Sequence, residues 1–228
     1  GLKSAQLAAL TTAQLSAVST DQLTVLNSQQ IGGLTTTQVK ALSTDQVSSL
    51  TSSQVAYLST AQLVAFTTAQ LQALTTAQAA NLTTAQVAAL TTNQVVALTS
   101  TQLNNLSTAQ AAALSVDQLK VIETADVAAL ASTQLRALTT DQLISLTTDQ
   151  VVALTSTQIN SLTTYQVSGL ATSQLVAIET ADLAEITSTV LRALTTDQLT
   201  ALTTDQVVAL TSAQVNSLTT AQLSAITT

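Results

Sequence analysis

The chain has 228 residues and a formal net charge of −7, with 7% charged and 1% aromatic residues. It contains no cysteine and no histidine, which excludes disulfide scaffolds, Cys/His zinc sites, thiol nucleophiles and Ser-His-Asp triads. Five basic residues against twelve acidic ones cannot form the clustered basic face that nucleic acid requires, and they disfavour an anionic membrane surface. No apolar run approaches the ~18 residues that indicate a membrane-spanning helix. We therefore expect neither a nucleic-acid partner nor membrane insertion.

An eight-residue repeat, here called the octad, organises the chain. Its pattern is [S/T]-[S/T]-x-Q-[apolar]-x-[small]-[apolar], and Thr195–Leu210 shows two copies, TTDQLTAL and TTDQVVAL. The pattern runs from Lys3 to Ile226 without insertion or deletion, so that 28 octads of eight residues account for 224 residues. Such strict repetition predicts a quasi-one-dimensional array in place of an ordinary globular domain.

Positions one and four of the octad carry the signature of a helix start. Position one is Ser or Thr in most octads, and position four is Gln in all but three. In this capping box the hydroxyl accepts from the N–H of position four, while the Gln side chain accepts from the N–H of position one. The apolar residue before the cap is placed to pack on position five as a hydrophobic staple. We therefore expect Thr195 with Gln198, and Thr203 with Gln206, to act as structural caps.

Neither a single long helix nor a strand fits the pattern. In a continuous helix the apolar stripe would drift by about 80° per octad and would bury no consistent face. In a strand, apolar spacings of three and five would alternate between the two faces. The remaining interpretation is a string of helices of about seven residues, each ended by the next cap. Helices this short are unstable alone and must pack on their neighbours.

Positions five and eight are apolar in every octad and lie on one helical face. We therefore predict that they form the core, with Leu199, Leu202, Val207 and Leu210 as examples, the last three among the most buried residues. Position seven is small and suits close backbone approach, whereas positions three and six accept charged residues and are expected at the surface. The predicted fold is an all-α solenoid of about 28 very short capped helices, a single continuous array over residues 1–228.

A longer period of 56 residues lies above the octad. Similar octads recur at Thr99–Leu106 (TSTQLNNL), Thr155–Leu162 (TSTQINSL) and Thr211–Leu218 (TSAQVNSL). Seven octads make such a block, and four blocks cover residues 3–58, 59–114, 115–170 and 171–226. Two explanations remain open. The blocks are tandem duplications, or seven octads complete a whole number of superhelical turns at about 3.5 octads per turn.

Paired carboxylates occur only in the two ETAD segments, Glu123 with Asp126 and Glu179 with Asp182. One interpretation is a variant cap, in which Glu occupies position one and Asp replaces Gln. The other is a weak calcium site built from these carboxylates and backbone oxygens. The sequence offers no other paired carboxylates, no cofactor motif and no catalytic constellation, so we predict a protein that is not an enzyme.

The LTTAQ motif, seen for example at Leu82–Gln86, resembles the octapeptide arrays of very large bacterial surface and secreted repeat proteins. The resemblance covers the whole chain. It implies an exported structural segment, extracellular or at the cell surface, that acts as a spacer, stalk or filament element. Its expected partners are further copies of itself or neighbouring repeats, joined end to end.

Two other functions compete with the structural one. Variation at positions three and six favours a protein- or glycan-binding platform on the outside of the solenoid. The ladder of Ser and Thr at positions one and two is compatible with binding of ice or another ordered surface. Capping already uses many of those hydroxyls, however, which weakens the last interpretation.

Overall fold

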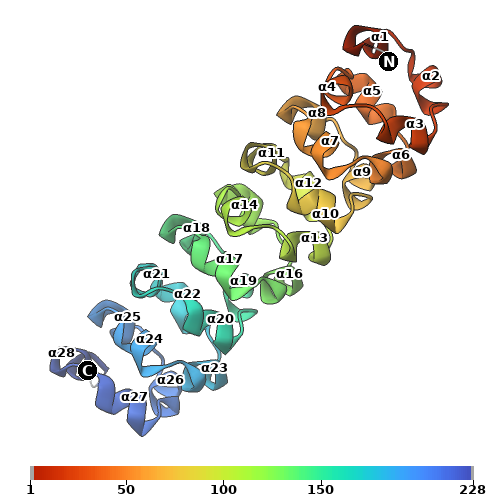
Figure 1. The fold of residues 1–228 in the computed structure, drawn as a ribbon. Coiled ribbons are helices and arrows are strands. Elements are labelled where there is room, and N and C mark those ends of the chain that lie inside the picture. Colours follow the sequence, from red (N-terminus) through yellow and green to blue (C-terminus); the bar gives the residue numbers. More distant parts are fainter. Residues whose placement is uncertain (1–2, 227–228) are drawn as a thin grey trace. The chain divides into compact units, whose positions relative to one another are not determined.

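The computed structural model describes residues 3–226, and every octad in this range forms one α-helix (Figure 1). Octad n therefore carries helix αn, with no β-strand in the described part of the chain. This confirms the all-α, one-helix-per-octad prediction. The chain divides into two compact units, and the boundary in the sequence falls between Leu114 and Ser115, which is also the junction of the second and third 56-residue blocks.

The first compact unit contains fourteen helices, which are α1 (Ser4–Ala8), α2 (Thr12–Ser16), α3 (Thr20–Thr24), α4 (Ser28–Gly32), α5 (Thr36–Ala41), α6 (Thr44–Ser49), α7 (Ser52–Tyr57), α8 (Thr60–Val64), α9 (Thr68–Gln72), α10 (Thr76–Ala80), α11 (Thr84–Ala89), α12 (Thr92–Ala97), α13 (Ser100–Asn104) and α14 (Thr108–Ala112).

The second compact unit contains the other fourteen, which are α15 (Val116–Lys120), α16 (Thr124–Ala129), α17 (Ser132–Ala137), α18 (Thr140–Ile144), α19 (Thr148–Val152), α20 (Ser156–Ser161), α21 (Thr164–Gly169), α22 (Thr172–Ala177), α23 (Thr180–Glu185), α24 (Ser188–Arg192), α25 (Thr196–Thr200), α26 (Thr204–Ala209), α27 (Ser212–Ser217) and α28 (Thr220–Ile226).

Each helix starts one residue after position one, and all but α28, which includes Ile226, end before position eight. The cap residue has extended backbone angles, as at Thr203 with φ −69° and ψ 158°. Position eight leaves the helix again, as at Leu210 with φ −65° and ψ 131°, while its N–H still bonds to the carbonyl of Val207 at 3.2 Å. The helices are therefore five to seven residues long, shorter on average than expected, because position eight turns inward to join the core.

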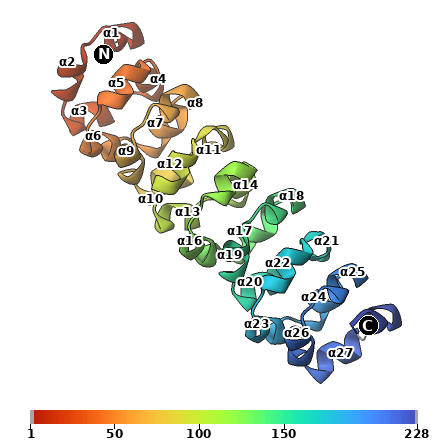
Figure 2. The same ribbon diagram turned by 180° about the vertical axis from the view of Figure 1, so that it is seen from behind.

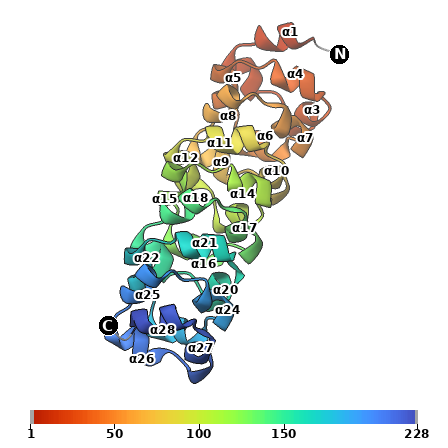
Figure 3. The same ribbon diagram turned by 90° about the vertical axis from the view of Figure 1, so that its left-hand side faces the viewer.

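Helix n packs on helix n+3 throughout both compact units. Examples are α4 with α7 and α8 with α11 in the first unit, and α22 with α25 and α25 with α28 in the second. Figure 2 shows α8 and α11 on the same side of the first unit, and Figure 3 shows α22 next to α25. Within each unit, this packing is what a solenoid of more than three octads per turn requires.

The core consists of positions five and eight, as predicted. At position five, Leu23 and Leu63 in the first unit and Leu135 in the second are fully buried. At position eight, Leu34 and Leu74 are almost as well covered. Burial of such a side chain contributes about 1.5–3 kcal/mol. Position six points outward, since the Val208 side chain is 78% exposed.

Among the named core residues, Leu199 is fully buried. Leu202 and Leu210 are buried but, at 8% and 9% exposed, are among the least covered residues of the core, and Val207 is only partly buried. The expectation that these three would be among the most buried residues was therefore wrong. Position five is covered by helices three and four octads later, and this sequence contains no such octads for octad 26. Leu223, at position five of octad 28, is 41% exposed for the same reason.

Position seven approaches position two of the octad three places earlier. A Cβ added at Gly33 would lie 2.6 Å from the Cβ of Ser4, and one added at Gly169 would overlap the Cγ2 of Thr140. These two glycines therefore stand where the n to n+3 packing leaves no room for a side chain. The small residues predicted at position seven serve this close approach.

Candidate functional site

The position-four glutamines are buried and hold three parts of the chain together. Gln102, which is 2% exposed, is representative. Its Oε1 accepts a hydrogen bond from the backbone N–H of Thr99 at 2.9 Å. Its Nε2 donates to the carbonyls of Leu71 at 2.9 Å and Leu74 at 2.7 Å. One amide thus completes the capping box of its own octad and binds the end of the helix four octads earlier.

This bridge recurs through both compact units. In the first unit the donors are Gln38, Gln46, Gln54, Gln62, Gln70, Gln78, Gln86, Gln94, Gln102 and Gln110. In the second unit they include Gln150, Gln158, Gln166, Gln174, Gln198, Gln206, Gln214 and Gln222. Helices pack on those three octads later, and glutamines bond to the octad four places earlier. One superhelical turn therefore contains between three and four octads, which agrees with the expected value of about 3.5 octads per turn.

The bridge explains why position four is glutamine. The carbonyl of position five, such as that of Leu71, already accepts from the N–H of position eight at 3.1 Å. The carbonyl of position eight has no such partner within its octad, and burying it unpaired would cost free energy. Glutamate could complete the capping box equally well, but it has no N–H to donate to those carbonyls. Sequence reasoning predicted only the bond within the octad and missed the bridge. The signal was available in the absence of glutamate from position four.

The four residues expected as caps lie where the capping box requires. The N–H of Thr195 donates to the Oε1 of Gln198 at 2.8 Å, and the N–H of Gln198 donates to the Oγ1 of Thr195 at 3.2 Å. For Thr203 and Gln206 the corresponding distances are 3.0 Å and 3.2 Å. Both glutamines also take part in the bridges to earlier octads.

The two ETAD pairs lie on different helices. Glu123 and Glu179 occupy the cap positions of α16 and α23, and neither side chain accepts a capping bond. Asp126 and Asp182 lie in the first turns of the same helices, where a negative charge interacts favourably with the helix dipole. Within residues 3–226, no three Asp, Glu, His or Cys side chains gather into a set that could hold a metal ion.

Octad 24 carries Val190 in place of the glutamine, and another octad supplies the missing acceptor. The N–H of Thr187 donates to the Oδ1 of Asn160 at 2.7 Å, and the Nδ2 of Asn160 donates to the carbonyl of Glu185 at 3.1 Å. Asn160 lies at position six of octad 20, four octads earlier. A link between octads n and n−4 is therefore kept, with octad 24 still the donor, but the side chain that makes it now belongs to the earlier octad.

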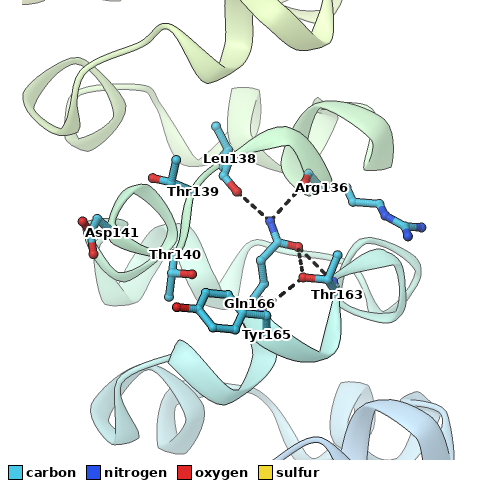
Figure 4. Close-up of a pocket in the computed structure, with 8 residues that line it drawn as sticks. All are labelled: Arg136, Leu138, Thr139, Thr140, Asp141, Thr163, Tyr165 and Gln166. Carbon is cyan, nitrogen blue, oxygen red and sulfur yellow. Dashed lines mark hydrogen bonds between the residues drawn. The ribbon is translucent and has the colours of Figure 1, made fainter.

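A surface hollow of about 450 Å³ lies between octads 17, 18 and 21 of the second unit (Figure 4). Tyr165 and Asp141, both at position three, line it together with Arg136 at position six. Figure 4 shows the Tyr165 ring beside Thr140, while the Arg136 guanidinium extends away from Asp141. Tyr165 is 76% exposed, so the hollow is a shallow outward face beside an aromatic ring.

None of the helices in residues 3–226 combines the length and apolar character needed to cross a membrane. The chain is an all-α repeat protein. Its helices pack on those three octads later, most begin with a capping box, and glutamine side chains link octads that are four places apart. The chain belongs to the ALTTAQ repeat family, whose model matches residues 1–36, 28–60, 56–84, 69–100, 87–121, 119–156 and 175–212. No curated protein matches the chain.

Proposed function

We propose that the array is a non-enzymatic structural segment, a spacer, stalk or filament element of a bacterial extracellular protein. The observation that carries this proposal is the glutamine bridge, repeated with one geometry in octad after octad. Every bridge ties an octad to the one four places earlier, so the contacts serve the continuity of the array. Equivalent octads extend the array, and no octad in residues 3–226 differs from the others in the way that an active site would require.

Membership of a repeat family and the absence of His and Cys from the sequence support the same role. The acidic balance, with twelve acidic against five basic residues, suits a solvated surface that repels nucleic acid. Localisation outside the cell and the bacterial source are part of the proposal, and they follow from the resemblance to surface and secreted octad arrays.

Length is the property that a spacer must control, and insertion of whole blocks tests it. One or two extra copies of residues 115–170 would be inserted after Leu170, keeping the octad frame. Small-angle X-ray scattering should show the maximum dimension increasing by the same amount for each added block. A maximum dimension that does not grow, or that grows unevenly, would contradict the structural role.

The hollow around Tyr165 favours a second candidate, a protein- or glycan-binding platform. An exposed aromatic ring beside a carboxylate and several hydroxyls offers stacking and hydrogen bonding to a sugar or to a polar peptide. Glycan arrays and pull-downs with the whole chain would test it. The binding candidate expects one saturable partner at submicromolar affinity, lost in Tyr165→Ala and kept in Tyr57→Ala in the other compact unit. The structural role expects no such partner.

Ordered-surface binding remains the third candidate. The capping bonds occupy the hydroxyls of position one, such as Thr195 and Thr203, so only position two would remain for an ice surface. An ice-recrystallisation assay separates this candidate from the other two.

A further inference from the structure

Charged side chains of the second compact unit repeat at intervals of 56 residues. Five pairs share this spacing, and they are Glu123 with Glu179, Asp126 with Asp182, Arg136 with Arg192, Asp141 with Asp197, and Asp149 with Asp205. Between three and four octads form one turn, so the seven octads of this interval make about two turns. The two members of a pair therefore lie on the same side of the solenoid, one further along the axis than the other.

The arginine row is the name used here for Arg136 and Arg192. Both arginines stand at position six, in octads 17 and 24, and both are exposed. In Figure 1, α24 repeats the place of α17 further along the second unit. Figure 4 shows the Arg136 guanidinium extending away from Asp141, and neither arginine forms an ion pair within residues 3–226. Two positive charges thus face outward, two turns apart, in a chain whose net charge is −7.

The acceptor row, here Asp149 and Val152 with Asp205 and Val208, has the same spacing. The aspartates stand at position three of octads 19 and 26, and both are exposed. Each valine follows its aspartate by three residues and shares its helical face, and the two valines are 36% and 78% exposed. A carboxylate beside an apolar side chain suits an arginine, because the arginine stem packs on apolar surface while the guanidinium binds the carboxylate.

The two rows lie on nearly opposite sides of the solenoid. With about 3.5 octads per turn, each octad turns the chain by about 100° about the axis, and the two octads from 17 to 19 turn it by about 200°. The arginine row therefore faces away from the acceptor row of its own chain. A second solenoid lying alongside presents its acceptor row to the arginine row of the first, and the equal spacing lets both arginines meet their partners together.

We propose that a second copy of this chain docks side by side with the first, so that Arg136 and Arg192 of one copy bind the acceptor row of the other. The contact uses different surfaces on the two copies and leaves one row free on each, so association continues laterally. A second copy supplies both rows, whereas a cationic peptide would leave the arginine row unused. The inference rests on the proposed structural role and deepens it by naming a partner.

The 56-residue period strengthens such a contact. A single exposed ion pair contributes little to affinity, and salt weakens it. Two pairs held in register act together, because the first pair to form keeps the second pair close. We therefore expect weak, salt-sensitive association of the chain, and stronger association of chains that carry further copies of the two rows.

Charge reversal in two separate variants tests the pairing. Variant A is Arg136→Asp with Arg192→Asp, and variant B is Asp149→Arg with Asp205→Arg. Each variant alone sets like charges against each other in the proposed contact, whereas a mixture of A and B pairs opposite charges there. Both variants remain net negative, because the wild-type charge is −7 and each pair of substitutions shifts it by four. General attraction between A and B therefore cannot produce association.

Sedimentation equilibrium at low ionic strength, over a range of protein concentrations, measures the association. The wild-type chain and the mixture of A and B should show an average mass that rises above 23.3 kDa, and A or B alone should stay at that mass. Salt at about 1 M, where the Debye length is about 3 Å, should reverse the association. A wild-type chain that remains at 23.3 kDa, or a mixture that behaves like its separate components, overturns the proposal.

Neutralisation of another carboxylate pair provides the matched control. Asp141→Asn with Asp197→Asn removes the same charge at the same spacing as Asp149→Asn with Asp205→Asn, but from octads 18 and 25. The control should associate at least as strongly as the wild type, while the acceptor-row variant should lose the association. Equal behaviour of the two variants would overturn the proposal. All four side chains are exposed, so thermal unfolding of both variants should match that of the wild type.

Inserted copies of residues 115–170 separate this proposal from the structural role. Each copy adds one arginine and one aspartate with its valine at the 56-residue spacing, so association at low ionic strength should strengthen with each block. Association that does not change with block number would overturn the docking. Equal growth of the maximum dimension for each block, measured at high salt, would still support the structural role in that case, so the two proposals fail independently.

Discussion

The Oδ1 of Asn160 accepts a hydrogen bond from the backbone N–H of Thr187 at 2.7 Å, across a separation of 27 residues. In other octads the glutamine of the same octad accepts this bond, as Gln198 does from Thr195. Val190 removes that glutamine from octad 24, and Asn160 in octad 20 takes its place. The donor at a helix start is therefore satisfied even where the repeat loses the residue that ordinarily serves it.

Removal of Asn160 should be costly only while Val190 is present. Asn160→Ala leaves the Thr187 N–H without its acceptor, and we expect a loss of about 0.5–1.5 kcal/mol in the free energy of unfolding. Val190→Gln restores a local acceptor, so Asn160→Ala should cost less in that background. A double-mutant cycle by urea unfolding measures this coupling. A coupling energy of zero would show that the two residues act independently.

The same substitution should have very different effects on stability at two glutamines that both occupy position four. Gln102→Glu places a buried carboxylate against the carbonyls of Leu71 and Leu74, which Nε2 now contacts. We expect a loss of about 3–5 kcal/mol, as for other uncompensated buried charges. Gln14→Glu keeps its cap bond at an exposed site and should change the free energy of unfolding by less than about 0.5 kcal/mol. Denaturant unfolding of the two variants makes the comparison, and similar losses would contradict the bridge.

The Gln102→Glu defect should depend on pH. Burial against carbonyl oxygens raises the pKa of the introduced carboxyl above the ordinary value of about 4.3. Below that value the carboxyl is protonated in both states and can donate, so the loss is small. The loss grows as pH rises through the ordinary value and levels off above the folded-state pKa. Unfolding measured from pH 3 to pH 7 checks this, with the wild-type chain as the reference.

The capping frame can be tested within one octad. Thr203→Ala removes the hydroxyl that accepts from the Gln206 N–H at 3.2 Å, and we expect a loss of about 0.5–2 kcal/mol. Val208→Ala, at a side chain that is 78% exposed, should cost less than about 0.5 kcal/mol. Thermal unfolding of the two variants should rank them in this order, and the reverse order would place the caps one position away.

Replacing Gly169 by alanine, which adds the smallest side chain, should destabilise the protein. Alanine is favoured over glycine in helices by about 1 kcal/mol, but a Cβ at position 169 would overlap the Cγ2 of Thr140. We therefore expect Gly169→Ala to destabilise the chain by about 1–3 kcal/mol. Thr140→Ser removes that methyl group and should restore most of the loss in the double variant. A stabilising Gly169→Ala measured by thermal unfolding would contradict the close approach of octads 18 and 21.

The features that could be predicted from sequence are those in which the interacting groups lie within one octad. The capping box joins Thr203 and Gln206, which are three residues apart, and the residue types that form it recur in the motif. The inward direction of positions five and eight follows from their spacing of three. These local rules were enough to predict one helix per octad and a core of Leu199, Leu202 and Leu210.

What could not be predicted depends on residues that meet only after the chain has coiled. The Nε2 of Gln102 finds the carbonyl of Leu71, 31 residues earlier, and no local pattern specifies which turn lies beneath it. The bond between Asn160 and Thr187 is equally remote. The burial of Val207 depends on contacts with octads three and four places later. Its position in the octad predicted a core residue but carried no information about those contacts.

The direction of the glutamine bridges has a consequence for synthesis. Each donor belongs to residues made 28 to 31 residues after the carbonyls it binds, as for Gln102 with Leu74 and Leu71. A chain emerging from the ribosome or a secretion channel therefore exposes each helix end until about four further octads have appeared. Because chains fold from the N-terminus as they are made, we expect each octad to become stably folded only after about four further octads have left the ribosome or the channel. Protease resistance in arrested chains of increasing length should advance octad by octad behind the newest residue.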